Sequence, residues 1–120
     1  MVKSFRELKV WQESMNLAKA IYPILRDFPE EERFGICDQI RRAVVSIPSN
    51  IAEGAGRESS LEYARFLAIA RGSLHELSTQ LELSVNLGYM KKQPGLFRKT
   101  EMIGRMLTAL IKKLKASPIR

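Results

Sequence analysis

The cations in the last quarter of the chain have the type and spacing of a phosphate-binding surface. Residues 91–120 carry nine Lys or Arg side chains and a single acid, Glu101, which makes this segment +8, whereas residues 1–90 sum to −1. Such asymmetry favours a polyanionic partner. A spacing of seven residues places Arg98, Arg105 and Lys112 on one side of a helix. We predict a nucleic-acid-binding stripe made of Arg98, Lys99, Arg105, Lys112, Lys113 and Lys115.

This basic stripe predicts contacts to the phosphate backbone of RNA or DNA with little sequence preference. No aromatic side chain alternates with the cations in a way that would stack on bases, because Phe97 belongs near the core. One alternative is a solvated face that maintains solubility. Another is a basic amphipathic helix lying in a lipid surface. We expect no membrane partner, because the segment lacks Trp and its apolar side is needed to complete the core.

A second polar stripe has residue types that are unusual for the solvated side of a helix. Ser, Asn and Gln are weaker helix formers than Lys or Glu and are good hydrogen-bonding groups. A face of this kind is suited to contact another helix, a subunit or a ligand, and the alternative is a solvated face. We predict a homo-oligomer interface at Gln39, Arg42, Ser46, Asn50, Glu53 and Arg57.

Enzymatic chemistry finds little support in the residue types. The chain has one His and one Cys, and no Asp or Glu pair has the spacing of metal ligands. The run Gly54-Ala55-Gly56-Arg57 lacks the preceding strand and the Gly-Lys-Ser/Thr of a phosphate loop. We therefore expect a non-enzymatic protein with no metal and no cofactor, in which His75 has a structural or interface role.

The length of 120 residues fits one domain with a modest core, and 45% apolar content is typical of a globular protein. No apolar run reaches the roughly 18 residues of a membrane span, and the N-terminus does not resemble a signal peptide. We expect a cytoplasmic protein. A single cysteine cannot form an intramolecular disulfide.

The elements that must position these groups are four helices, at roughly 4–27, 31–53, 59–87 and 94–116. Ser59 and Glu62 form a capping box, and Gly88 follows the third helix as a C-cap. Pro23 and Pro48 are expected to kink the first and second helices. Short connections favour antiparallel neighbours, so we predict an all-α, antiparallel up-down-up-down four-helix bundle.

Each helix has an apolar seam at three- and four-residue steps. In the first helix we place the seam at Leu8, Trp11, Met15, Ala18, Tyr22 and Leu25. In the second it is Ile36, Ile40, Ala43, Val44, Ile47 and Ile51. The third uses Leu67, Ala70, Leu74, Leu77 and Leu81, and the fourth uses Leu96, Ile103, Leu107, Leu110 and Leu114.

Several blocks of the sequence, in order, resemble a bacterial family of small four-helix-bundle proteins. The densest block is Gln39 to Arg57. It contains Ile47-Pro48-Ser49-Asn50-Ile51-Ala52-Glu53-Gly54, and further blocks lie at Phe5 to Gln12, Phe66 to Leu77 and Leu87 to Tyr89. Some members are encoded in intervening sequences of 23S rRNA genes. Related bundles are accessory proteins of diversity-generating retroelements, and they form basic pentameric rings that bind nucleic acid and a reverse transcriptase.

The resemblance implies a homopentamer with nucleic acid as its partner and a retroelement reverse transcriptase as a further candidate partner. Two functional classes remain open. The first is a nucleic-acid-binding accessory protein, and the second is an assembly module whose ring has no nucleic-acid role. The +8 segment favours the first class.

Overall fold

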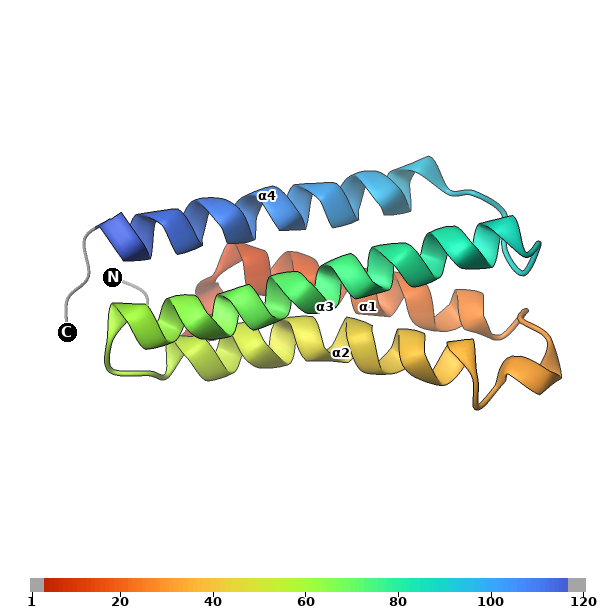
Figure 1. The fold of residues 1–120 in the computed structure, drawn as a ribbon, viewed down its shortest axis with the longest axis horizontal. Helices are drawn as coiled ribbons and strands as arrows, with labels where there is room; N and C mark the ends of the chain where they lie inside the picture. The colour runs from red at the N-terminus through yellow and green to blue at the C-terminus, as the bar shows by residue number, and fades with distance from the viewer. Residues whose placement is uncertain (1–3, 117–120) are drawn as a thin grey trace.

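The computed structural model describes residues 4–116, and this part of the chain is all-α. Consecutive long helices reverse direction, which confirms the predicted antiparallel four-helix bundle (Figure 1). A short 3-10 helix, η1, precedes the first long helix, and a second, η2, lies between α1 and α2. The elements are η1 (Phe5–Glu7), α1 (Lys9–Leu25), η2 (Glu30–Glu32), α2 (Ile36–Ala55), α3 (Ser60–Asn86) and α4 (Pro94–Ala116).

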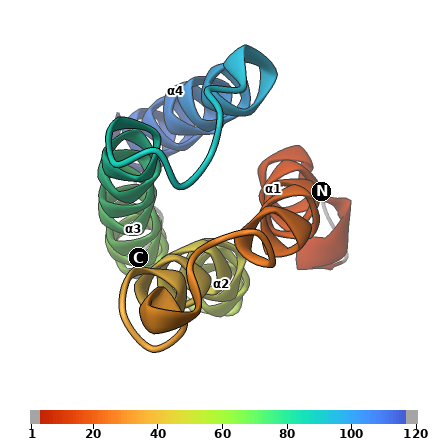
Figure 2. The same cartoon turned by 90° about the vertical axis from the view of Figure 1, so that its right-hand side faces the viewer.

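The four helices follow one another around the bundle axis in chain order, so α2 lies between α1 and α3, and α3 lies between α2 and α4 (Figure 2). The most extensive helix pair is α2 with α3, and the least extensive is α1 with α4. The predicted seams of α2 and α3 are buried, except that Ile36 is half-buried at the start of α2. In α4, Leu96, Ile103 and Leu107 are buried, and Ile111 completes the seam.

The seam predicted for α1 is confirmed only in part. Leu25 is buried, and Leu8, Trp11 and Ala18 pack half-buried against the core, but Met15 and Tyr22 are 37% and 43% exposed. The core instead receives Val10, Leu17 and Ile21, which the prediction left out. The stripe of Val10, Leu17 and Ile21 was not predicted as buried because the polar residue Ser14 interrupts its apolar pattern. Ser14 is fully buried, and its hydroxyl donates to the carbonyl of Val10 at 2.7 Å, which satisfies its polar group inside the helix.

Two helices begin later than the sequence indicated. Leu8 is extended (ψ 125°), so it separates η1 from α1, which begins at Lys9 rather than near residue 4. The glutamates at 30–32 form η2, and α2 begins at Ile36 rather than near residue 31. Glu32 caps α2, because its Oε1 accepts a hydrogen bond from the Ile36 amide at 3.2 Å.

Pro48 does not end α2, which continues to Ala55 as the apolar spacing indicated. The Ser49 hydroxyl donates to the carbonyl of Val45 at 2.8 Å. Gly54 lies inside the helix, where an added Cβ would be 2.8 Å from Cβ of Phe66. This glycine therefore allows the end of α2 to approach the start of α3 closely.

The ends of α3 match their sequence signals. The Ser59 hydroxyl accepts from the Glu62 amide at 3.1 Å, and Gly88 has φ +79° after the last turn. The next residue, Tyr89, packs its ring on Phe28 and donates its hydroxyl to Glu32 at 2.9 Å. This hydrogen bond raises the pKa of Tyr89, and it ties the loop after α3 to the residue that caps α2.

Candidate nucleic-acid and assembly surfaces

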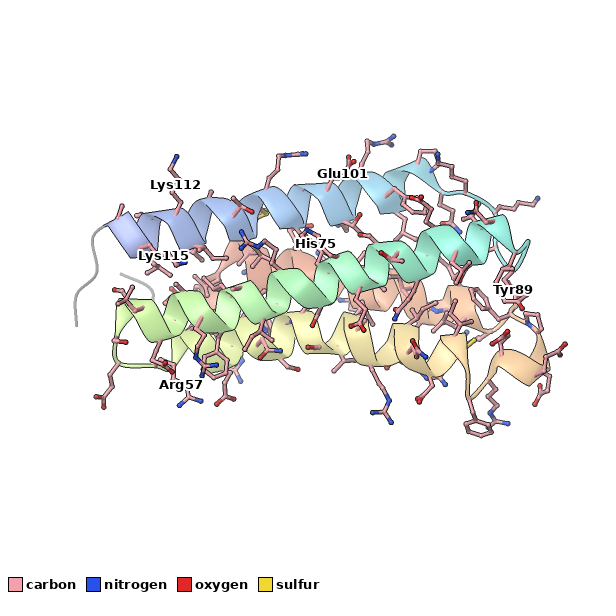
Figure 3. The ribbon with its side chains drawn as sticks, viewed as in Figure 1. Arg57, His75, Tyr89, Glu101, Lys112 and Lys115 are labelled. Atoms are coloured by element: carbon pink, nitrogen blue, oxygen red, sulfur yellow. The ribbon has the colours of Figure 1, made fainter. Side chains whose placement is uncertain are left out.

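The cations predicted to bind phosphate divide into an outward row and its flanks. Arg98, Arg105 and Lys112 are exposed along the side of α4 opposite its buried seam. Figure 3 shows Lys112 pointing away from the bundle, while Lys115 lies on the other side of the helix. Lys113 is also exposed. We call Arg98, Arg105 and Lys112 the basic row.

Lys99 differs from the other predicted cations because it is tied to another helix. Its Nζ is 2.8 Å from Oε1 of Glu13 on α1, and Lys9 lies 3.6 Å from the same carboxylate. The hydrogen bond from Lys99 lowers the pKa of Glu13. Lys99 therefore joins α4 to α1, and five of the six predicted cations remain without an ion pair within the described chain.

A groove of about 570 Å³ between α3 and α4 brings further polar groups beside the basic row. Arg105 and Lys112 line it from α4, and His75 and Ser78 line it from α3. Figure 3 shows His75 on the side of α3 that faces α4. Near the groove, Arg71 donates to the Thr108 hydroxyl at 3.1 Å. Glu101 is the acid that lines this groove.

The sequence did not indicate that Arg71 and His75 would be neighbours of the basic row. Their four-residue spacing on α3 was visible, but nothing in the sequence indicated which side of α3 would face α4. The α3–α4 groove could not be predicted from the sequence either, because its lining comes from two helices whose relative register is decided by packing.

The polar stripe predicted as an oligomer interface makes hydrogen bonds within its own chain. Ser46 Oγ lies 2.9 Å from Ser73 Oγ on α3, and the Asn50 amide donates to both the carbonyl and the hydroxyl of Ser46. Arg42 pairs with Asp38 one turn away. The hydrogen bonds that we expected across a subunit contact are therefore supplied largely by α2 and α3.

The remaining residues of the polar stripe lie at the two ends of this row of hydrogen bonds between α2 and α3. At one end Arg57 pairs with Glu53, and its guanidinium lies over the ring of Phe66 at 4.6 Å from the centroid. At the other end Nε2 of Gln80 donates to the side-chain Oε1 of Gln39 at 3.5 Å, a long hydrogen bond. Gln39, Arg42, Asn50, Glu53 and Arg57 keep some exposed surface, so a role of the stripe in assembly stays a prediction.

Gln80, at the contact between α2 and α3, has a buried oxygen without a hydrogen-bond partner in the described residues. The side chain is 8% exposed, and its Oε1 accepts no hydrogen bond within the described chain. It borders a pocket of about 340 Å³ that is also lined by Gln39, Ser73 and Glu76. A donor from water or from a partner would satisfy this oxygen.

An apolar groove of about 710 Å³ lies on the outer side of the α1–α2 pair. From α1 it is lined by half-buried Trp11 and by Met15 and Tyr22, the two residues wrongly expected in the core. From α2 it is lined by Val45, which is 46% exposed, and by Pro48. We call this feature the α1–α2 groove; its other lining residues are Ala18, Lys19, Pro23, Arg26, Ser49 and Ala52.

Other features of the described residues offer no arrangement for metal or thiol chemistry. No group of three or more His, Cys, Asp or Glu side chains within residues 4–116 could hold a metal ion. Cys37 is buried, and burial raises the pKa of its thiol, which disfavours the reactive thiolate. Over the same residues, no helix is long and apolar enough to cross a membrane.

Comparison with known proteins places this arrangement in a family. The family model described as 23S rRNA-intervening sequence protein matches residues 6–109, which include all of α1, α2 and α3 and most of α4. The chain belongs to this family. No curated protein matches the chain.

A solved structure supports the fold of this family member. It is a protein of unknown function from the S23 ribosomal protein family of Bacteroides thetaiotaomicron. The two chains are 26% identical and superpose with a TM-score of 0.76, covering 86% of this chain and 98% of the other. The similarity therefore extends over nearly the whole bundle.

Proposed function

We propose that this protein is a non-enzymatic, nucleic-acid-binding bundle that contacts phosphates through α4. The observation that carries the proposal is the basic row, Arg98, Arg105 and Lys112, which stands on one exposed side of α4 and forms no ion pair within residues 4–116. Lys113 and Lys115 add charge on its flanks. A row of cations at helical spacing matches the repeated negative charge of a nucleic-acid backbone.

The α3–α4 groove supports the same proposal. Arg71 and His75 extend the donors of α4 onto a second helix, so a strand lying along the groove would meet cations from both sides. The groove is polar at its edges, and none of its lining residues is a Phe, Tyr or Trp on which a base would stack. Binding should therefore depend on the backbone and only weakly on the sequence.

The salt dependence of binding tests this proposal. If about five cations on one protomer neutralise duplex phosphates, the slope of log K against log salt is roughly −4.5. Raising salt from ~50 to ~200 mM then lowers affinity by several hundred-fold on the same counterion-release estimate. Fluorescence anisotropy with duplex DNA, structured RNA and an RNA–DNA hybrid measures this. Absence of binding to all three at about 10 μM protein, roughly −7 kcal/mol, would overturn the proposal.

We further propose a homo-oligomer, with five protomers as the number that the family resemblance implies. In a ring, copies of the basic row would repeat around the assembly and present a larger cationic surface to nucleic acid. A reverse transcriptase of a retroelement is the protein partner implied by the same resemblance. A retroelement beside this gene would support that partner, whereas a 23S rRNA gene around it would support a role with an rRNA intervening sequence.

An assembly module without a nucleic-acid role is the second candidate function. The observation in its favour is the α1–α2 groove, an exposed apolar surface that the nucleic-acid proposal does not use. The two candidates differ in one measurement. An assembled protein that binds none of the three nucleic acids at low salt would be an assembly module.

A further inference from the structure

The α1–α2 groove leaves apolar surface uncovered in a small bundle. Trp11 is half-buried, while Met15, Tyr22 and Val45 are between 37% and 46% exposed and lie around one depression. Single exposed apolar residues are common, but a group that lines one groove marks an interaction site. The groove has room for several side chains of a partner helix.

The outer side of α3 carries a second row of exposed apolar residues. Ile69 and Leu83 are 40% and 46% exposed, and Leu87 is 52% exposed. A spacing of 14 residues places Ile69 and Leu83 on the same side of the helix, with Gly72 and Glu76 between them. We call Ile69, Gly72, Glu76 and Leu83 the α3 ridge.

Gly72 has no explanation within a single chain. It lies in the interior of α3, where glycine costs roughly 0.5–1 kcal/mol relative to alanine, and its backbone does not have a positive φ. A Cβ added at Gly72 would meet nothing within 4 Å. By contrast, Gly54 is required by the neighbouring Phe66. An exposed helical glycine is accounted for when the backbone of another helix approaches it closely.

The charges of the two surfaces are complementary. Lys19 and Arg26 line the α1–α2 groove, which has no acidic lining residue, and neither forms an ion pair with another described residue. On α3, Glu76 belongs to the ridge and is exposed without an ion pair in residues 4–116, whereas Arg65, on the same side of the helix, is paired with Glu62. The ridge therefore offers an unpaired carboxylate to the unpaired cations of the groove.

We propose that the α1–α2 groove of one copy receives the α3 ridge of a second copy of this chain. This inference rests on the homo-oligomer proposed above and names its contact surfaces. The exposed apolar residues of the ridge enter the groove, Gly72 allows close approach, and Glu76 meets the cations of the groove. Because α1 and α3 lie at opposite corners of the bundle (Figure 2), groove and ridge belong to different sides of the molecule, and the proposed contact is heterologous, with each copy offering one of each.

A heterologous contact explains why both surfaces occur on one small chain. A groove that paired with the groove of its neighbour would leave the α3 ridge uncovered and Gly72 unexplained. When a groove-to-ridge contact closes by rotation, it generates a ring, and every groove and every ridge is then covered. The basic row on α4 takes no part in this contact.

Two substitutions test the contact from its two sides. Val45→Glu places a charge in the groove, and Gly72→Leu blocks close approach at the ridge. Each is expected to reduce the mass measured by light scattering to that of one chain, 13.7 kDa. The matched control for Gly72→Leu is Ala20→Leu, which adds a similar side chain at an exposed position of α1 outside the groove and should leave the mass unchanged.

Folding of the variants is checked independently by circular dichroism and thermal unfolding. Both substituted positions are exposed and helical, and leucine is a better helix former than glycine, so the bundle should remain folded. A mixing experiment then tests the heterologous geometry. The Val45→Glu protein retains its ridge and the Gly72→Leu protein retains its groove, so an equimolar mixture should form a complex of two chains.

The outcomes separate this inference from the proposal on which it rests. A monomeric wild-type protein at micromolar concentration would overturn the homo-oligomer itself. An oligomeric wild type whose mass does not change with Gly72→Leu would overturn the groove-to-ridge contact alone. If Gly72→Leu has no effect while Val45→Glu dissociates the oligomer, the grooves pair with each other. A mixture of the two variants that stays monomeric would also contradict the heterologous contact.

Discussion

The α1–α2 groove and the basic row on α4 are two exposed surfaces of one bundle with opposite physical character. The groove is lined mostly by apolar side chains with two cations, Lys19 and Arg26, whereas the basic row consists of three exposed cations at helical spacing. Apolar contacts act at short range and respond little to salt, whereas exposed cations act over about 10 Å at 0.1 M salt and are screened above it. The difference indicates two partners of different chemistry, which can be perturbed separately.

The largest expected effect comes from reversing charge on one surface and then on the other. Arg105→Glu with Lys112→Glu removes two phosphate contacts and adds repulsion, so nucleic-acid affinity should fall by at least about 100-fold at ~100 mM salt. The mass of the assembly should not change, because neither residue lies in the groove or the α3 ridge. Anisotropy titration and light scattering measure the two properties.

The matched control changes the formal charge by the same four units at the groove. Lys19→Glu with Arg26→Glu should weaken assembly, while each chain keeps its basic row. Binding of a short duplex that occupies a single protomer should then change much less than in the α4 variant. Equal losses of affinity in the two variants would mean that net charge alone governs binding, and the distinction between the surfaces would fail.

Two glycines sharpen the distinction between contacts inside the chain and contacts between chains. Gly54→Ala forces a Cβ against Phe66, and such overpacking should lower the free energy of unfolding by about 1–3 kcal/mol. In the monomeric Val45→Glu background, Gly72→Ala should raise it by about 0.5–1 kcal/mol, because its Cβ would enter open space. Urea unfolding measures both. Destabilisation by Gly72→Ala in that background would show that Gly72 has a role within the single chain.

The ion pair between Glu13 and Lys99 connects α1 to α4, and its removal should have a smaller effect on binding. Glu13→Gln releases Lys99, so the salt slope for duplex DNA should steepen by up to about 0.9, the value of one added phosphate contact. An unchanged slope would mean that Lys99 does not reach phosphate even when it is free.

The same ion pair predicts how the stability of the fold changes as the pH is lowered. Lys99 lowers the pKa of Glu13 in the folded state, so the stabilisation is complete above the ordinary Glu pKa of about 4.3 and is lost as pH falls through the lower folded value. The melting temperature of wild type should therefore exceed that of Glu13→Gln at pH 7, and the difference should shrink below about pH 4. A difference that grows on acidification would contradict the assignment.

Much of the bundle could be predicted because its signals are local. The seams of α2 and α3 repeat without interruption, and the capping of Ser59 and the turn at Gly88 depend on residues that are adjacent in the chain. The spacing of the basic row was also readable, because residues seven apart on a helix must share a side. Sequence periodicity is sufficient when one stripe is clearly more apolar than the others.

The sequence by itself determined four helices, three of their four buried sides and the position of the excess charge. Only the tertiary structure decided which of two apolar stripes of α1 enters the core. It buried Leu17 and Ile21 beside Ser14, whose hydroxyl is hydrogen-bonded within its own helix, and left Met15 and Tyr22 exposed. It also placed His75 beside α4 and left Gly72 open. Adjacent stripes on one helix differ by about 100° of rotation, and only the shapes of the neighbouring helices select between them.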